Sequence, residues 1–172
     1  MMTASDVTVS ILKTCDEFIG FECEKQECFD FARNSEKAQK YQLQNLGVTY
    51  VFRAGETPIG FVTIAMGSLR KQDSIANGRT EKSSGAVPCV LIEYIARDFR
   101  YKGKGVGKVM IDWVINLAHE SSKTVGCRFV VVEIPQQQIT LFQSYGFELI
   151  PPDRRDRHYL MFFDLGIMAS LG

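Results

Sequence analysis

The sequence lacks an excess of charge of either sign, since 20 basic side chains balance 20 acidic ones among its 172 residues. A neutral chain has no global field to attract nucleic acid or an anionic membrane surface. It also lacks any apolar run near the ~20 residues that span a bilayer. Its first residues, MMTASDVTVS, show no basic segment followed by an apolar one, as a secretory signal would. We therefore expect a cytoplasmic protein with no membrane contact, and the charge balance gives no reason to expect a nucleic-acid partner.

The sequence also lacks the cysteine and histidine spacings of a metal site or a disulfide framework. Its five cysteines are odd in number and include no Cys-x-x-Cys pair, and it has only two histidines. A secreted disulfide scaffold or a zinc ribbon would need paired or closely spaced cysteines. We therefore predict reduced, mostly buried thiols and no metal ion.

Hydrophobic patterning predicts one α/β domain over residues 1–172, because strand-like and helix-like apolar spacings alternate along the chain. The expected strands cover residues 7–12, 48–54, 59–67, 89–97, 127–134 and 158–165. The expected helices cover residues 24–42, 104–121 and 136–145, and a polar loop covers 68–88. A loop of this length is either disordered or functional, so its role stays open. The strand–helix–strand unit implies parallel neighbours and the 48–67 hairpin is antiparallel, so the sheet is mixed.

The stretch RYKGKGVGKVM (Arg100–Met110) places three glycines and four basic side chains between a predicted strand and a predicted helix. Its spacing fails the P-loop pattern, because Lys108 stands where the second glycine is required. A dinucleotide-binding turn is also poorly matched, because the glycines follow as Gly-x-Gly-x-Gly. Unpaired N–H groups at a helix N-terminus, flexible glycines and nearby cations can instead hold a pyrophosphate. A tight turn with solvated lysines is the alternative interpretation.

The same stretch resembles the coenzyme-binding motif (Gln/Arg)-x-x-Gly-x-(Gly/Ala) of the GNAT acetyltransferases, matched here by Arg100, Gly103 and Gly105. Upstream, IEYIARDFRYKGKGVG is similar to that family's strand running into its coenzyme loop, and ITLFQSYGF is similar to its Tyr-x-x-x-Gly-Phe block. The resemblance covers most of the chain. It implies a single GNAT-like α/β domain whose mixed central sheet splays in a V between two parallel strands, with helices on both faces.

The resemblance also implies which residues bind acetyl-CoA as cosubstrate. Backbone groups of the strand end are expected to pair with the pantetheine amides, as an added strand would. The basic glycine turn is expected to hold the pyrophosphate. The residues so implied are Tyr94, Ile95, Ala96, Arg97, Arg100, Tyr101, Lys102, Gly103, Lys104, Gly105, Val106, Gly107 and Lys108.

Glu93 is the candidate general base for an amine acceptor. It lies inside the otherwise apolar run LIEYIA. A buried ionised carboxylate is costly unless it is paired, so its presence needs a reason. One reason is catalysis, and the other is a salt bridge or a position at the edge of a cleft without a chemical role.

The candidate general acid departs from the family pattern. Where many relatives carry a tyrosine that can protonate the coenzyme A thiolate, this sequence has Phe142, which has no hydroxyl. Tyr145 lies three residues further on and is the substitute candidate. A core aromatic beside the helix end is the alternative interpretation of Tyr145.

The expected activity is transfer of an acetyl group from acetyl-CoA to a primary amine on a small molecule or a protein, by direct attack. Two alternatives stay open. The front half of the chain, with FECEKQECFDFARNSEKAQ, VTYVFRA and PIGFVTIAMGS in that order, is similar to toxin-type GNAT proteins, which acetylate aminoacyl-tRNA. Only under that interpretation do we expect a nucleic-acid partner. The missing hydroxyl at Phe142 motivates the other alternative, a catalytically weak module that binds acetyl-CoA. The acceptor is not identified, and a homodimer is compatible with the sequence.

Overall fold

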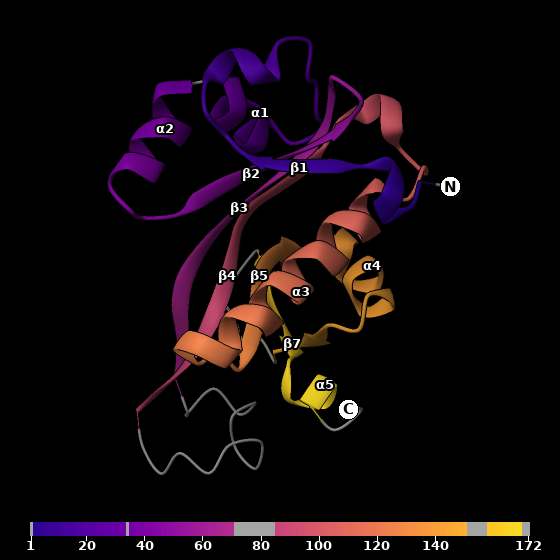
Figure 1. Ribbon diagram of the computed structural model, residues 1–172. Helices are drawn as coiled ribbons and strands as arrows, with labels where there is room; N and C mark the ends of the chain where they lie inside the picture. The colour runs from indigo at the N-terminus through magenta and orange to yellow at the C-terminus, as the bar shows by residue number, and fades with distance from the viewer. Residues whose placement is uncertain (1, 34, 71–84, 151–157, 170–172) are drawn as a thin grey trace. The chain divides into compact units, whose positions relative to one another are not determined.

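A computed structural model describes residues 2–33, 35–70, 85–150 and 158–169 (Figure 1). The described strands form one seven-stranded sheet with the order β1-β2-β3-β4-β5-β7-β6. The strands are β1 (Thr8–Ile11), β2 (Val48–Ala54), β3 (Thr57–Arg70), β4 (Ala86–Arg97), β5 (Phe129–Pro135), β6 (Glu148–Leu149) and β7 (His158–Asp164). The helices are α1 (Gln26–Arg33), α2 (Ser35–Leu43), α3 (Val106–Val125), α4 (Ile139–Ser144) and α5 (Gly166–Ala169). Short 3-10 turns are η1 (Ala4–Asp6), η2 (Cys15–Phe18), η3 (Phe99–Tyr101) and η4 (Gln136–Gln138).

The predicted mixed sheet is confirmed by the strand pairing. Strands β4 and β5 are parallel, whereas β1–β2, β2–β3, β5–β7 and β6–β7 are antiparallel. The parallel register runs from the pair Cys89 and Phe129 to the pair Ile92 and Val132. Strand β4 continues beyond this register to Arg97. The end of the parallel pairing therefore falls directly before Glu93.

The chain divides into two compact units, and β3, β4 and α3 each pass from one unit to the other. The first unit comprises Met1–Ala65 and Glu93–Asp112, and the second comprises Met66–Ile92 and Trp113–Gly172. In the first unit, buried side chains of α1 and α2 pack against the sheet, with Phe31 and Phe61 in the same cluster. Figure 1 shows α1 and α2 beside β1 and β2.

The first unit carries helices on both faces of its strands, as predicted. Side chains of adjacent strand residues point to opposite faces. Phe61 faces the α1 cluster. The neighbouring Gly60 faces α3, since a Cβ on Gly60 would lie only 2.6 Å from the Met110 Sδ. Helix α3 can therefore approach β3 closely because position 60 has no side chain.

The second unit has a core of its own around β5 and β7. Phe129, Val131 and Phe162 are buried there, and the Phe129 and Phe162 rings meet edge to face at 5.5 Å. Five of the seven residues of β5 are buried, which explains its continuous apolar sequence, since a central strand is covered on both faces. Burial of these apolar side chains therefore holds β5 and β7 together in this unit.

Several predicted bounds were wrong. The helix expected over 24–42 is two helices, and the second starts at Ser35, a residue type that favours helix N-termini. Residues 68–70 and 86–88, expected in the loop, belong to β3 and β4, and residues 71–84 lie outside the described residues. Helix α3 starts and ends later than the expected 104–121. Residues 136–138 are a 3-10 turn, the final strand ends at Asp164, and β6 was not predicted.

Cys23, Cys28, Cys89 and Cys127 are free thiols, two of them buried and two half-buried. Burial raises the pKa of the Cys23 thiol to about 11 and that of Cys89 to about 12.

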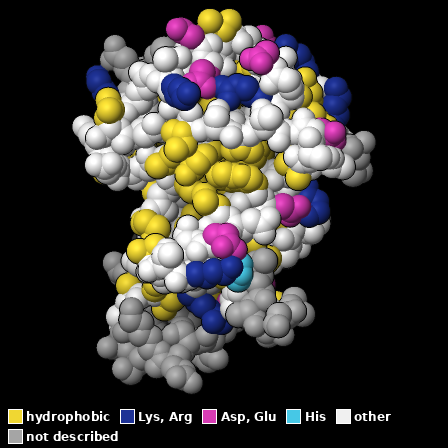
Figure 2. Space-filling model, in the orientation of Figure 1, with side chains coloured by type: hydrophobic (Ala, Val, Ile, Leu, Met, Phe, Trp, Pro, Cys, Tyr) yellow, Lys and Arg dark blue, Asp and Glu magenta, His cyan; other side chains and the backbone are white. Residues whose placement is uncertain are grey.

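Figure 2 shows basic and acidic side chains interspersed on the face in view. Within the described part of the chain, no helix is long and apolar enough to cross a membrane.

Candidate active site

The basic glycine turn joins β4 to α3 and lies in the first unit. Gly103 has a φ of 74° and Gly105 a φ of 88°, backbone conformations that strain any residue with a side chain. Apart from the adjoining residues, no described atom lies within 4 Å of the place where a Cβ on Gly103 would be. Helix α3 begins at Val106, so its first N–H groups have no acceptor within the helix. Within the described part of the chain, the turn therefore presents N–H groups without an acceptor beside open space.

A buried carboxylate braces this turn. The Asp98 side chain is fully buried, and it accepts hydrogen bonds from the N–H of Glu22 (3.2 Å) and the N–H of Arg100 (2.9 Å). It also accepts two bonds from the Arg100 guanidinium, at 2.8 Å from Nε and 2.6 Å from Nη2. Burial would raise the pKa of Asp98, but the bonds and charge of Arg100 and the Glu22 N–H together hold it below its usual value. Asp98 thus stays ionised and ties the turn to the segment before α1.

The sequence interpretation missed Asp98, although a signal was present. An aspartate directly after a strand and before a short turn is a typical N-cap, and Asp98 caps η3 by accepting from the Arg100 N–H. Its bond to Glu22, 76 residues away, had no such local signal. The contact explains why an aspartate, which is rarely buried, is tolerated at this position.

The basic side chains that were predicted to bind the coenzyme already contact other groups of the protein. The Arg100 guanidinium bonds Asp98 and donates to the Gly20 carbonyl at 2.7 Å, so its main contacts brace the turn. Lys102 Nζ lies 2.8 Å from a Glu24 carboxylate oxygen. Three further basic side chains have contacts too: Lys108 with Asp112, Lys104 with the Tyr101 ring and Arg97 with Glu24. The backbone is therefore the main anion-binding feature of the turn, and the lysines add a partly neutralised field.

The end of β4 carries the residues predicted to lie along the pantetheine. Ala96 is buried, and Tyr94 and Ile95 are half-buried. The Tyr94 ring stacks on the Phe31 ring at 3.9 Å between centroids and 12° between planes. This contact fixes Tyr94 in the core of the first unit.

An open pocket of about 440 Å³ lies close to the turn in the same unit. It is lined by Glu22, Cys23, Glu24, Gln26, Phe29 and Phe99. Phe99 comes from η3, and the other lining residues surround the start of α1. The pocket is therefore built by the segment that Asp98 ties to the turn.

Glu93 is half-buried and directly follows the last β4 residue paired with β5. Its Oε2 accepts a hydrogen bond from the Tyr41 hydroxyl. Among the described residues no donor lies on Oε1. Tyr41 was not predicted, because 52 residues separate the two and no local pattern joins them. The carboxylate is thus paired on one oxygen, as a half-buried charge requires.

Phe142 and Tyr145 lie in the second unit, at α4 and its C-terminal end. Phe142 is only 4% exposed and meets the Phe147 ring edge to face at 5.4 Å. The Tyr145 ring lies 6.0 Å from the Phe142 ring and is half-buried. Phe142 is therefore a core residue, which explains why this position has an apolar aromatic side chain.

Comparison with known protein families identifies the family of this chain. The family model described as "Acetyltransferase (GNAT) family" matches residues 16–147, more than half of the chain. The match includes both halves of β4, the glycine turn and α4. The chain therefore belongs to the GNAT family of acetyltransferases.

The chain is similar to two curated relatives, one named a probable toxin and the other a toxin. The probable toxin TacT of Sinorhizobium fredii is 26% identical over 106 residues, which cover 56% of this chain and 59% of TacT. A tRNA-acetylating toxin of Mycobacterium tuberculosis is 27% identical over 97 residues, which cover 55% of this chain and 57% of the toxin. The chain thus spans little more than half the length of the curated relatives that it matches.

Solved structures of the toxin AtaT and of KacT share the fold of this chain. A mutant of KacT has a TM-score of 0.82 at 18% identity, covering 97% of this chain and 99% of KacT. AtaT complexed with acetyl-methionyl-tRNAfMet has a TM-score of 0.79 at 18% identity, with 96% and 99% covered. A mutant AtaT bound to acetyl-CoA and to the C-terminus of its antitoxin AtaR has a TM-score of 0.74 at 20% identity, with 96% and 97% covered. These likenesses confirm the predicted GNAT fold.

Proposed function

We propose that this protein is an acetyl-CoA-dependent N-acetyltransferase whose acceptor is the amino group of an aminoacyl-tRNA. The observation that carries the proposal is the placement of Glu93. A carboxylate stands on β4 where its pairing with β5 ends, in the same compact unit as a braced glycine turn. A candidate base and an anion-binding turn thus lie on one strand and its continuation.

The turn fits the pyrophosphate of coenzyme A. The first N–H groups of α3 lack acceptors in the helix, and the space at the Gly103 Cβ position is open. A helix N-terminus adds roughly half a positive charge. Gly103 to Lys108 would hold the pyrophosphate, while the backbone from Tyr94 to Arg97 would take the pantetheine. When bound, acetyl-CoA supplies an activated thioester as the acetyl donor.

In this proposal Glu93 is the general base, and Tyr145 remains the predicted candidate for the general acid. The acceptor amine arrives as an ammonium ion, and Glu93 accepts its proton so that the nitrogen can attack the thioester carbonyl carbon. A carbon–nitrogen bond forms and the carbon–sulfur bond breaks. The nitrogen loses its second proton as the amide forms, and this loss balances the proton that the leaving thiolate takes up, either from solvent or from the predicted acid Tyr145. Phe142 takes no part, because it is an apolar core residue.

The aminoacyl-tRNA acceptor is favoured by the relatives. One curated relative is a tRNA-acetylating toxin, and AtaT has been solved with acetyl-methionyl-tRNAfMet. The prediction that nucleic acid is an unlikely partner outside the toxin-type alternative is therefore not supported. The acceptor nitrogen would still be a primary amine, as the sequence interpretation requires. AtaT is also seen with an antitoxin, so a protein partner is part of the toxin-type proposal.

Acetyl transfer to charged tRNA tests the proposal. The purified protein is incubated with radiolabelled acetyl-CoA and bulk tRNA that is either aminoacylated or deacylated, and acid-precipitable label is counted. We expect label on charged tRNA alone, with a rate reduced about 100-fold in Glu93→Gln, as for loss of a general base. Label on small amines but not on charged tRNA would contradict the acceptor class. Tight acetyl-CoA binding without any transfer would contradict the enzyme and favour a binding module.

A further inference from the structure

A tyrosine from a different element holds the carboxylate of Glu93. Tyr41 lies near the end of α2, and its hydroxyl donates a hydrogen bond to Glu93 Oε2. Both side chains are half-buried and belong to the first unit. The bond occupies one carboxylate oxygen and leaves Oε1 without a donor among the described residues. Because this bond fixes the carboxylate group, the direction of its second oxygen, Oε1, is defined as well.

The Tyr41 ring is itself placed by its surroundings. It meets the Phe31 ring edge to face, at 6.3 Å between centroids and 83° between planes. On another side it lies against the backbone of Gly47, where a Cβ would come within 2.7 Å of Tyr41 Cε1. A glycine at position 47 therefore makes room for the ring, and any larger residue would displace it.

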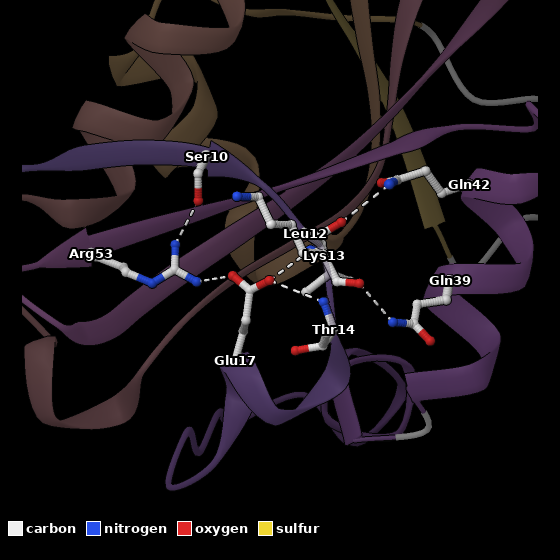
Figure 3. A network of polar contacts seen from close by, with 8 residues as sticks. All are labelled: Ser10, Leu12, Lys13, Thr14, Glu17, Gln39, Gln42 and Arg53. Atoms are coloured by element: carbon white, nitrogen blue, oxygen red, sulfur yellow. Dashed lines mark hydrogen bonds and ion pairs between the residues drawn. The ribbon is translucent and has the colours of Figure 1, made fainter.

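Helix α2 is held in turn by glutamines on either side of Tyr41. The amide of Gln39 donates to the Lys13 carbonyl at 2.8 Å, and that of Gln42 donates to the Leu12 carbonyl at 3.1 Å (Figure 3). The same segment is fixed from its other side, because Glu17 accepts from the Lys13 N–H at 2.6 Å. Figure 3 shows these contacts converging on the chain between β1 and η2. The end of α2 thus has a defined position over the strands.

The Tyr41 hydroxyl keeps its proton over the whole physiological range. Burial raises the pKa of Tyr41 to about 12, and the bond to Glu93 and its negative charge act in the same direction. Burial also raises the pKa of Tyr94, the neighbour of Glu93, and the charge of Glu93 adds to it. Both phenols therefore keep their protons near neutral pH, so the Tyr41 hydroxyl is available as the donor to Glu93.

We propose that Tyr41 is a positioning residue that holds Glu93 so that its Oε1 faces the acceptor amine. The inference rests on the proposed function, because it requires Glu93 to be the base. Orientation of a catalytic group contributes to the rate of the step in which it acts and not to binding of the coenzyme. Tyr41 should therefore affect kcat and leave the KM for acetyl-CoA unchanged.

The test combines steady-state kinetics with a double-mutant cycle on the full chain. With charged bulk tRNA as acceptor, we expect Tyr41→Phe to lower kcat about 10-fold and to leave the KM for acetyl-CoA within about 2-fold. Adding Tyr41→Phe to Glu93→Gln should cause no further loss, since residues that act as a unit are not additive. Tyr50→Phe removes a hydroxyl from another half-buried tyrosine of the same unit and should keep the wild-type kcat.

A measurement without substrate separates this inference from the proposed function. In protein with ¹³Cζ-labelled tyrosine, one NMR resonance should vanish in Tyr41→Phe, and the same resonance should shift in Glu93→Gln. That shift together with the kinetic result supports the proposal. A wild-type rate in Tyr41→Phe while Glu93→Gln is slow would overturn the role of Tyr41 and leave the proposed function intact. A fast Glu93→Gln enzyme, or no transfer by the wild type, would overturn both, even if the resonance shifts.

Discussion

Replacement of Asp98 by asparagine tests how the glycine turn is held. The carboxylate accepts four hydrogen bonds, two from the Arg100 guanidinium and two from backbone N–H groups. Asparagine keeps one acceptor oxygen but turns an amide donor toward the guanidinium. Hydrogen bonds to charged groups contribute about 1.5–3 kcal/mol each. Because the Arg100 side chain is 48% exposed, solvent screens part of this interaction. We therefore expect Asp98→Asn to lower the free energy of unfolding by about 2 kcal/mol.

The same substitution should weaken coenzyme binding, because a loosened turn must be ordered when acetyl-CoA binds. We expect the Kd for acetyl-CoA to rise about 10-fold. Urea denaturation measures the first effect, and calorimetric titration with acetyl-CoA measures the second. Glu120→Gln is the matched control, since it makes the same chemical change in the exposed pair with Lys123 and should alter neither quantity. Equal stability and equal coenzyme affinity in the two variants would refute the bracing role of Asp98.

The contribution of Asp98 to the free energy of unfolding should decrease as the solution becomes acidic. The pKa of its carboxyl group is lower in the folded protein than in an unfolded chain. A depressed pKa contributes stability that is fully present above the unfolded value and is lost as the pH falls through the folded value. The stability difference between wild type and Asp98→Asn should therefore be constant near neutrality and should shrink below about pH 4. A difference that grows on acidification would contradict this assignment.

Three further substitutions test the turn and the acid. Gly105→Val forces a β-branched residue to a φ of 88° and should abolish acetyl-CoA binding in calorimetry, and unchanged affinity would argue against the turn. Phe142→Tyr places a hydroxyl at a 4% exposed position and should cost about 1–3 kcal/mol in urea denaturation without raising kcat. A faster Phe142→Tyr enzyme would contradict the assignment of this residue to the core. Tyr145→Phe should lower kcat about 100-fold if its hydroxyl is the acid, and full activity would remove it from the mechanism.

Features that depend on neighbouring residues could be predicted from the sequence. Strand β2 was predicted with its observed bounds, Val48–Ala54, because branched and aromatic residues run continuously there. The parallel pair was predicted from continuous apolar runs on either side of a helix. The glycine turn was located because its conformation needs glycine whatever the rest of the fold does.

Features that depend on distant contacts could not be predicted. The role of Arg100 depends on Asp98 and on the Gly20 carbonyl, which is 80 residues away. Glu93 was selected as a carboxylate in an apolar strand, but its partner Tyr41 comes from a helix whose position only the fold determines. Phe142 was interpreted as a missing acid because the sequence does not show which face of α4 is buried. In each case the tertiary contact decides the role of the side chain.

The most direct test of the central claim is the chemical identity of the product. Charged tRNA is incubated with the protein and acetyl-CoA and then digested with ribonuclease, and the terminal aminoacyl-adenosine is analysed by mass spectrometry. The proposed function predicts N-acetyl-aminoacyl-adenosine with the wild type and a strongly reduced amount with Glu93→Gln. Unmodified aminoacyl-adenosine after prolonged incubation of a wild-type protein that binds acetyl-CoA would contradict it.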